Sequence, residues 1–183
     1  MTETTWPQWL PIRPNLSALS PYGAPQVEAQ ASLNTNENPF ALSQEFTAAI
    51  ANRISEIAST LNRYPDRDAT QLRAALATYI NEQSGTAIDA SNVWVANGSN
   101  EIIQSLFLAC GERGAIGFLP SYSMHPLIAK VTSSPWIDGL RRSDLSLDVE
   151  NAISQINQSH VGMVFITTPN NPTGEAISIS DIE

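Results

Sequence analysis

The asparagine-proline run at residues 170–174 is the segment of the sequence most able to do chemistry. It reads Asn-Asn-Pro-Thr-Gly and follows an apolar stretch that ends at Ile166. Pro172 restricts the backbone after Asn171, and Gly174 permits a positive φ. An amide held in this way can donate a hydrogen bond to an anionic oxygen of a ring. The alternative is a proline turn that only ends a strand.

A second segment, Asn97-Gly98-Ser99-Asn100-Glu101, joins an apolar stretch to a predicted helix. The first N–H groups of a helix lack partners within the helix, and the helix dipole adds positive potential at that end. These amides could therefore hold a phosphate without a lysine. The alternative is an ordinary turn in which Ser99 or Asn100 is the N-cap.

Two further segments each offer a tyrosine. Tyr122 lies in Pro-Ser-Tyr-Ser-Met-His, directly after a predicted strand, where it could stack on a flat cofactor or only cover the sheet edge. We interpret His125 as a surface or packing residue rather than a base. Tyr64 lies in Asn-Arg-Tyr-Pro, which is either a surface turn or a means of reaching a phosphate across a subunit boundary.

Alternating strands and helices must position these segments. Apolar residues at three- and four-residue steps predict helices, and short apolar runs predict strands. The predicted helices span residues 43–61, 69–84, 99–110, 120–131, 149–156 and 178–183, with Ser43 as an N-cap. The predicted strands span residues 93–96, 115–119, 134–140 and 161–166, the last covered on both faces. This order predicts an α/β fold with a mostly parallel sheet.

The first 40 residues are rich in proline, which opposes regular structure. Aromatic residues are interleaved with the prolines, so we expect an extended arm that docks through aromatic anchors. These anchors are Trp6, Trp9, Tyr22 and Phe40. The chain stops at a helix start, just after an apolar strand, and we interpret it as the N-terminal part of a larger protein.

Composition excludes several classes of function. The formal net charge of −9 argues against a nucleic-acid or anionic-membrane partner. The single cysteine, Cys110, allows no intrachain disulfide, and we expect a buried, inert thiol. There is no stretch of transmembrane length and no signal-peptide pattern at the start, so we expect a soluble cytoplasmic protein. Lys130 is the only lysine, and we expect it on the surface.

Taken in order, these motifs resemble those of the fold-type-I pyridoxal-phosphate-dependent aminotransferases. The resemblance extends from about Pro11 to Glu183 and includes Asn36-Glu37-Asn38-Pro39. Within that group, the sequence of residues 96–101 and 120–126 is similar to that of the histidinol-phosphate aminotransferases of actinobacteria. The resemblance implies a three-layer αβα sandwich, of which the chain would contain an arm at 1–40, in the small domain, and an incomplete large domain at 41–183.

The resemblance implies pyridoxal 5'-phosphate as the cofactor and no metal. In the family, residues at the positions of Ser99 and Asn100 hold the cofactor phosphate. Tyr122 matches the residue that stacks on the pyridine ring. Asn171 matches the residue that donates to the phenolic oxygen.

The remaining matches imply a homodimer and a substrate pocket. Tyr64 would reach the cofactor of the partner subunit, while Tyr22 and Asn38 would border the substrate. The implied reaction transfers an amino group between glutamate and imidazole-acetol phosphate, giving 2-oxoglutarate and histidinol phosphate, in histidine biosynthesis.

Three readings stay open at this point. The family's Schiff-base lysine, the aspartate that pairs with the pyridine nitrogen and the arginines for the substrate phosphate lie beyond the asparagine run, so we expect this chain alone not to transaminate. Another aminotransferase of the class, or a lyase similar to threonine-phosphate decarboxylase, shares the same motifs. A non-catalytic, truncated relic is the third reading.

Overall fold

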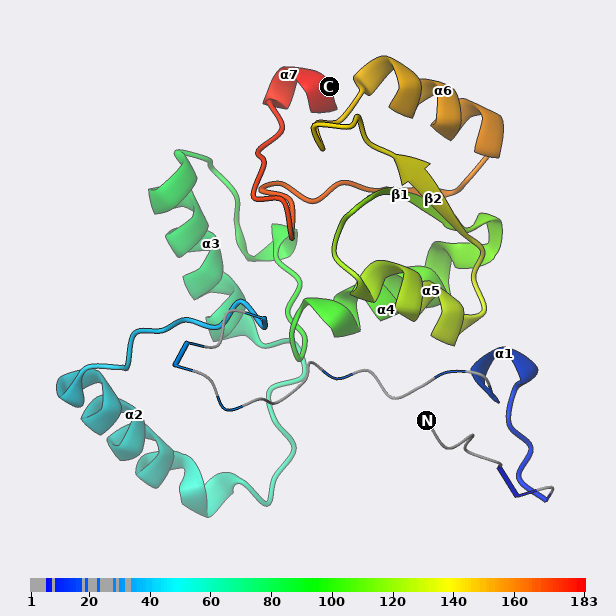
Figure 1. Cartoon of the computed structure of the whole chain (residues 1–183). Helices are drawn as coiled ribbons and strands as arrows, with labels where there is room; N and C mark the ends of the chain where they lie inside the picture. The colour runs from blue at the N-terminus through cyan, green and yellow to red at the C-terminus, as the bar shows by residue number, and fades with distance from the viewer. Residues whose placement is uncertain are drawn as a thin grey trace. The chain divides into compact units, whose positions relative to one another are not determined.

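The computed structural model describes residues 6, 7, 9–17, 19, 23, 28, 30, 31 and 34–183. The chain divides into two compact units, and Figure 1 labels the α-helices together with β1 and β2. Unit 1 contains residues 1–19 and 96–183, and unit 2 contains residues 20–95. The division into an arm at 1–40 and a large domain from residue 41 stays a prediction.

A three-stranded parallel sheet forms the centre of unit 1. Its strands are ordered β2-β1-β3, and Ala115 of β1 lies opposite both Trp136 and Met163. The main elements are α4 (Ser99–Cys110), η3 (Gly111–Arg113), β1 (Ala115–Leu119), α5 (Met124–Thr132), β2 (Trp136–Leu140), α6 (Val149–Ser159), β3 (Met163–Phe165) and α7 (Ile179–Ile182). Ser178 caps α7 by accepting from the Asp181 amide, whereas the capping-box spacing of Ser180 and Glu183 favours Ser180 as the cap. The predicted α/β fold with a parallel sheet is therefore confirmed.

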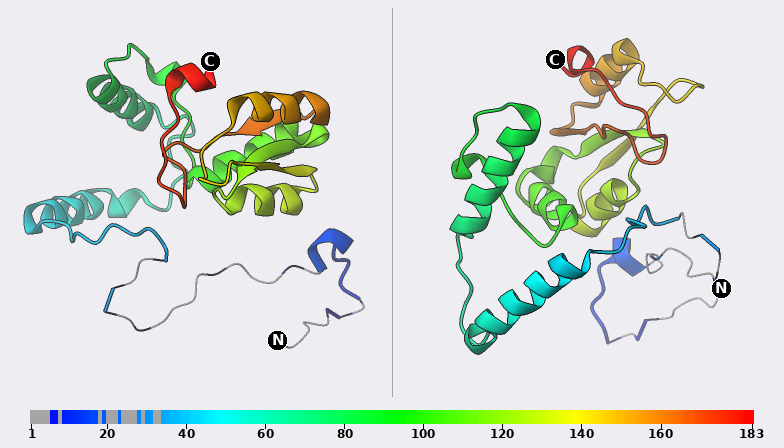
Figure 2. Two further views of the ribbon diagram at one scale, coloured as in Figure 1. Left: turned by 45° about the horizontal axis from the view of Figure 1, so that its top comes forward. Right: turned by 90° about the vertical axis from the view of Figure 1, so that its left-hand side faces the viewer.

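Helices cover both faces of this sheet (Figure 2), which gives the three layers expected of the fold. On one face, Phe107 of α4 and Ile128 of α5 pack with Ala115. On the other face, Ala152 of α6 packs with residues of β1 and β2. Neighbouring residues of β1 belong to different cores because successive side chains of a strand point to opposite faces.

The prediction that the strand near residue 163 is covered on both faces is wrong. β3 is an edge strand, and Val164 is 40% exposed. Met163 and Phe165 pack against the core beside α4 and α5, but α6 packs over β1 and β2 and leaves Val164 open. The strand covered on both faces is β1, in which residues 115–118 are all buried.

Unit 2 consists of helices. They are α2 (Gln44–Ile57), η1 (Ala58–Thr60), α3 (Thr70–Ser84) and η2 (Ala90–Asn92). The predicted cap is confirmed, because the Ser43 hydroxyl accepts from the Phe46 amide at 3.1 Å. The predicted break is confirmed too, since the Asp66 carboxylate accepts from the Thr70 amide at 2.8 Å at the start of α3. Backbone hydrogen bonds from Thr70 and Asp68 lower the pKa of Asp66.

The predicted strand at residues 93–96 does not form. Val93 has an extended backbone, but no strand of the described chain pairs with it. Its carbonyl instead accepts from Nε of Arg73 at 2.7 Å, and Nη2 of Arg73 donates to Ala90 O at 2.6 Å. A strand needs a neighbour for its backbone groups, and here a guanidinium takes that place.

The described aromatic residues of the arm do not dock as predicted. Trp9 is 79% exposed and Phe40 is 81% exposed. Among the described residues of the arm, Asn15 in the short helix α1 (Pro14–Ser17) makes a polar contact with the end of α5, where it donates to Lys130 O at 2.7 Å. Among the described residues, no helix has the length and apolar character that crossing a membrane requires.

Candidate functional site

Helix α4 starts without a side-chain cap. Gly98 is the N-cap, with φ 82° and ψ 169°, and no side chain bonds the first amides. The alternative in which Ser99 or Asn100 is the N-cap is therefore wrong, because both lie inside the first turn. The Glu101 carboxylate accepts from the Asn97 amide at 2.5 Å and so closes the loop before the helix. The first turn thus offers unclaimed N–H groups at the positive end of the helix dipole.

Tyr122 lies beside this helix start. Its hydroxyl donates to Oδ1 of Asn100 at 3.2 Å, although the two residues are 22 positions apart. The ring is half-buried and meets the His125 ring edge-on at a centroid distance of 5.3 Å. The structure therefore brings Tyr122 and the first turn of α4 together, as a ring-and-phosphate site requires.

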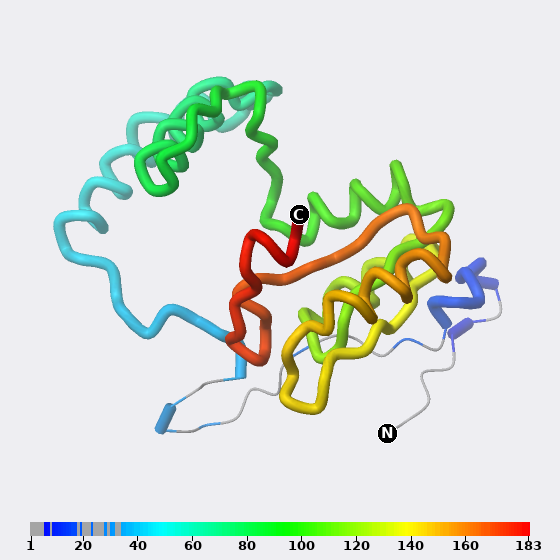
Figure 3. The backbone as a smooth tube through the Cα atoms, turned by 90° about the horizontal axis from the view of Figure 1, so that it is seen from above, coloured from blue at the N-terminus to red at the C-terminus, as the bar shows by residue number. Residues whose placement is uncertain are grey.

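The asparagine turn, residues 170–174, follows β3 along the orange-to-red backbone of Figure 3. The Gly174 amide donates to Asn170 O at 2.6 Å, and the Asn170 amide donates to Glu175 O at 2.7 Å. Gly174 has φ 74°, the positive value that the motif predicts. Asn171 is exposed at the outside of the turn, whereas Asn170 is buried.

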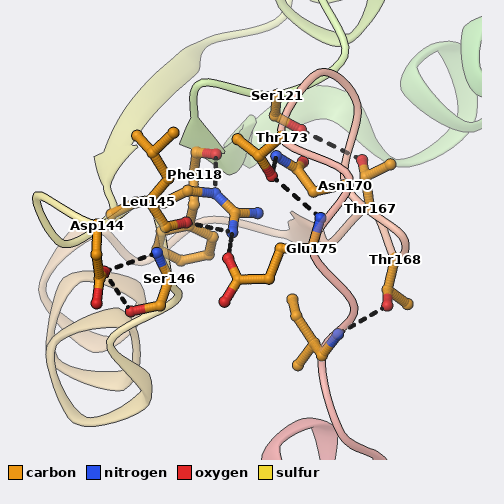
Figure 4. Close-up of polar contacts among 12 residues, drawn as sticks. Phe118, Ser121, Asp144, Leu145, Ser146, Thr167, Thr168, Asn170, Thr173 and Glu175 are labelled. Carbon is orange, nitrogen blue, oxygen red and sulfur yellow. Dashed lines mark hydrogen bonds and ion pairs between the residues drawn. The ribbon is translucent and has the colours of Figure 1, made fainter.

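Contacts link this turn to the segment that carries Tyr122. Nδ2 of Asn170 donates to Pro120 O at 3.0 Å, and the hydroxyls of Ser121 and Thr167 lie 3.2 Å apart. Figure 4 shows the Ser121–Thr167 contact and the side chain of Asn170 beside Thr173. The polar segments after β1 and β3 therefore meet at the carboxyl ends of these strands, where open α/β sheets bind ligands.

His125 is a packing residue, as the sequence predicts. It is 8% exposed, and its ring lies 4.6 Å from that of Phe165 and 6.3 Å from that of Trp136. Burial lowers the pKa of His125, because the charged imidazolium loses its hydration.

We expect the free energy of unfolding to fall as the pH drops below about 6.5, the ordinary histidine pKa. The pKa of His125 is lower in the folded chain, so in this range the unfolded chain binds the proton more readily. The stabilisation that neutral His125 contributes is complete above the histidine pKa of the unfolded chain. It is lost as the pH falls through the lower pKa that His125 has in the folded chain. Urea unfolding between pH 8 and 5 measures this, and His125→Gln should flatten that part of the profile. The control is His160→Asn, which replaces the other histidine of the sequence. His160 is exposed, and this variant should leave the profile intact.

Other predicted site residues belong to unit 2 or lie outside the described residues. Tyr64 is fully exposed in the turn between η1 and α3. Oδ1 of Asn38 accepts from the Phe40 amide at 3.0 Å and so shapes the local turn. Tyr22 lies outside the described residues.

Lys130 and Cys110 are both exposed. Lys130 is in the last turn of α5, at the end opposite Tyr122, which confirms the prediction of a surface lysine. The prediction of a buried Cys110 is wrong, because this last residue of α4 lies beyond the helix's final core contact, at Phe107.

Sequence reasoning missed three residues around the asparagine turn: Asn170, Arg141 and Glu175. The two adjacent asparagines, Asn170 and Asn171, were a signal that one of them could have a structural role distinct from that of the other. Nothing in the local pattern marks Arg141, whose side chain is 2% exposed and lies 3.8 Å from the Glu175 carboxylate.

Comparisons with known proteins agree with this geometry. The family model for aminotransferase class I and II matches residues 28–183. A histidinol-phosphate aminotransferase of Nocardia farcinica is 49% identical over 175 residues, which are 94% of this chain and 46% of that protein. One of Mycolicibacterium smegmatis is 46% identical over 94% of this chain and 80% of that protein. The predicted actinobacterial resemblance is confirmed, and the chain spans about half the length of most of these relatives.

Solved structures show the same fold. The histidinol-phosphate aminotransferase of Sinorhizobium meliloti, solved in complex with pyridoxal-5'-phosphate, has a TM-score of 0.66 and 19% identity over 81% of this chain and 38% of that one. The histidinol-phosphate aminotransferase of Clostridium acetobutylicum has a TM-score of 0.60 and 24% identity over 81% of this chain and 40% of that one. At these identities the likeness concerns the fold alone.

Proposed function

The chain belongs to the class I and II aminotransferase family, and we propose that its full-length gene product is a histidinol-phosphate aminotransferase. The proposed reaction moves an amino group from glutamate to imidazole-acetol phosphate and back. The observation that carries the proposal is the uncapped start of α4 beside Tyr122, in a chain 46–49% identical to relatives of that name.

The residues present fit pyridoxal 5'-phosphate. A phosphate needs several donors and positive potential, and the first turn of α4 supplies both through amides that no side chain caps. A planar ring needs an aromatic neighbour, and Tyr122 is held at this helix end by its bond to Asn100. The exposed amide of Asn171 adds a donor on the neighbouring loop.

We assign roles on this basis. Ser99 and Asn100 would hold the cofactor phosphate through their backbone amides, Tyr122 would stack on the ring, and Asn171 would donate to its phenolic oxygen. When bound, the cofactor supplies an electron sink for negative charge at the substrate's α-carbon. The chain's own residues orient that ring and exclude water from one of its faces.

The contributions of the other matched residues are proposals that concern the assembled protein. A fully exposed Tyr64 is available to a second subunit, which supports a homodimer in which it reaches the partner's cofactor. We place this homodimer in the cytoplasm as part of the proposal. Tyr22 and Asn38 would border the substrate. Under this proposal the arm belongs to the small domain and residues from 41 onward belong to the large domain.

A substrate comparison tests the proposal. The full-length gene product, loaded with pyridoxal phosphate, should convert histidinol phosphate and 2-oxoglutarate to glutamate with a higher kcat/KM than it shows for phenylalanine. A higher kcat/KM for phenylalanine, or release of carbon dioxide from threonine phosphate, would contradict the proposal in favour of the related activities. Absence of all three reactions would favour a non-catalytic protein.

Asn171→Ala should weaken cofactor binding by about 1–3 kcal/mol, the scale of a hydrogen bond lost from a group that stays buried. Equilibrium titration of the full-length gene product with pyridoxal phosphate measures this change. Asn157→Ala is the matched control, since it removes an exposed asparagine of α6. Equal affinities of wild type and Asn171→Ala would remove this residue from the site.

A further inference from the structure

Two neighbouring asparagines occupy opposite environments in the asparagine turn. Asn171 is exposed, but Asn170 is only 2% exposed. Nδ2 of Asn170 donates to Pro120 O at 3.0 Å and to Oγ1 of Thr173 at 2.8 Å. The first contact spans 50 positions of sequence and reaches the segment that leads into Tyr122. One amide therefore joins the two loops that carry the proposed ring contacts.

The chemistry of the partners sets the orientation of this amide. Pro120 O can only accept, so the amide nitrogen must face it. Oδ1 of Asn170 is then left buried with no partner among the described residues. An unpaired buried acceptor is destabilising, so stability alone does not account for an asparagine at this position. The hydrogen bond by which Asn170 fixes the two loops relative to each other does account for it.

A second anchor holds the far end of the same turn. Arg141 follows β2, and its side chain is 2% exposed. Its Nε donates to Phe118 O at 3.1 Å, and its Nη1 donates to Leu145 O at 3.2 Å. The same Nη1 lies 3.8 Å from the carboxylate of Glu175, the residue after the turn. One end of the turn is thus hydrogen-bonded to Pro120 O, directly after β1, and the other end lies near a guanidinium that is hydrogen-bonded to Phe118 O of β1.

We propose that Asn170 is a positioning residue that sets the location of Asn171 relative to Tyr122. Arg141 supports the same turn from its other end, through Glu175. The role of Asn170 toward a ligand rests on the proposed function, but its structural effect on Tyr122 does not. Asn170 itself would not touch the ring.

Fluorine NMR of the chain labelled with 3-fluorotyrosine tests the proposal without any cofactor. The chain has four tyrosines, and Tyr122→Phe identifies the Tyr122 signal. Asn170→Asp nearly preserves volume but sets a carboxylate oxygen against Pro120 O. We expect it to move the Tyr122 signal by more than a linewidth and to leave that of Tyr79, in unit 2, in place. Asn171→Asp, the matched change next door, should move neither signal.

A destabilising control separates positioning from general loss of structure. Ala152 is buried on the α6 face of the sheet, and Ala152→Gly should lower the melting temperature without moving the Tyr122 signal. Should Asn170→Asp fail to fold, Thr173→Ala decides the matter, because it removes one partner of the amide and should itself move the Tyr122 signal by more than a linewidth. An unmoved Tyr122 signal in the folded Asn170 variant, or an equal shift in Ala152→Gly, would overturn the proposal.

A second measurement links the positioning role to the cofactor. In the full-length gene product, Asn170→Asp should raise the dissociation constant of pyridoxal phosphate at least fivefold. Arg141→Lys keeps the charge but cannot reproduce both carbonyl contacts, and it should have a smaller effect. A moved Tyr122 signal with unchanged cofactor affinity would overturn the link to the ligand. A wild-type protein that does not bind the cofactor would instead contradict the proposed function.

Discussion

Replacing Gly98 with valine should lower the affinity for pyridoxal phosphate on the order of a hundredfold. The physical reason is the backbone, since Gly98 has φ 82° and ψ 169°, a conformation almost restricted to glycine. A Cβ there would meet nothing within 4 Å, so crowding does not contribute. Relief of the strain would turn the first amides of α4 away from the phosphate. Losing two charge-assisted hydrogen bonds costs about 3 kcal/mol or more, and about 1.4 kcal/mol corresponds to each tenfold change.

Calorimetric titration of the full-length gene product measures that affinity. Gly85→Val is the matched control: it also has a positive φ, of 64°, and open space around its Cβ, but it ends α3 in unit 2. It should lower stability and leave the affinity within about threefold of wild type, the effect of less than 1 kcal/mol. Equal losses of affinity in the two variants would show that strain anywhere in the chain acts on the site, and would remove Gly98 from its assigned role.

Gly114→Ala should reduce the free energy of unfolding by about 4 kcal/mol, the sum of backbone strain and overpacking. Gly114 has φ 72°, and an added Cβ would collide with the carbonyl oxygen of Pro135 and lie 2.7 Å from its Cβ. The residue cannot move away, because its own carbonyl accepts from the amides of Gly162 and Met163 at 3.1 and 3.2 Å. These contacts begin the pairing of β1 with β3.

Urea unfolding followed by circular dichroism measures the effect on the 183-residue chain. Gly162→Ala is the control nearby, because its φ is not positive and its nearest Cβ contact is 3.4 Å, to Cys110 O. We expect that variant to lose less than about 1 kcal/mol. If Gly114→Ala lowers the free energy of unfolding no more than Gly162→Ala does, the prediction is wrong. The backbone at the start of the sheet would then shift to accommodate the added Cβ.

The helices and several of their ends followed from local sequence, although α5 starts at Met124 and not at residue 120, and α6 continues to Ser159 and does not end at residue 156. Ser43 caps α2 and Gly85 ends α3, both at the predicted position. Caps and helical periodicity depend on residues within about four positions of each other, so the sequence contains all the information that they need. β1 and β2 formed where short apolar runs between helices predicted strands. The same reasoning failed at residues 93–96, because a strand also needs a neighbouring strand, which local sequence does not specify.

The site motifs were predictable as motifs, and their arrangement was not. The sequence alone marked the start of α4, Tyr122 and Asn171 as candidate ligand contacts, and it identified the family. It could not show that Tyr122 bonds Asn100 across 22 positions or that Asn170 bonds Pro120 across 50. Such pairs depend on which strands become neighbours, and strand order is a property of the whole sheet.

Burial was decided by tertiary structure alone. Cys110 and Val164 are flanked in the sequence by apolar residues, as core residues often are, yet both are exposed. Asn170 is polar and stands beside an identical residue, yet it is among the most buried side chains of the described chain. The reason is that apolar periodicity specifies a face, whereas burial requires another element to cover that face. The sequence by itself therefore determined the helices, some of their caps and the candidate ligand contacts. The meeting of the segments after β1 and β3, which depends on strand order, decided which asparagine faces solvent and which holds the loops together.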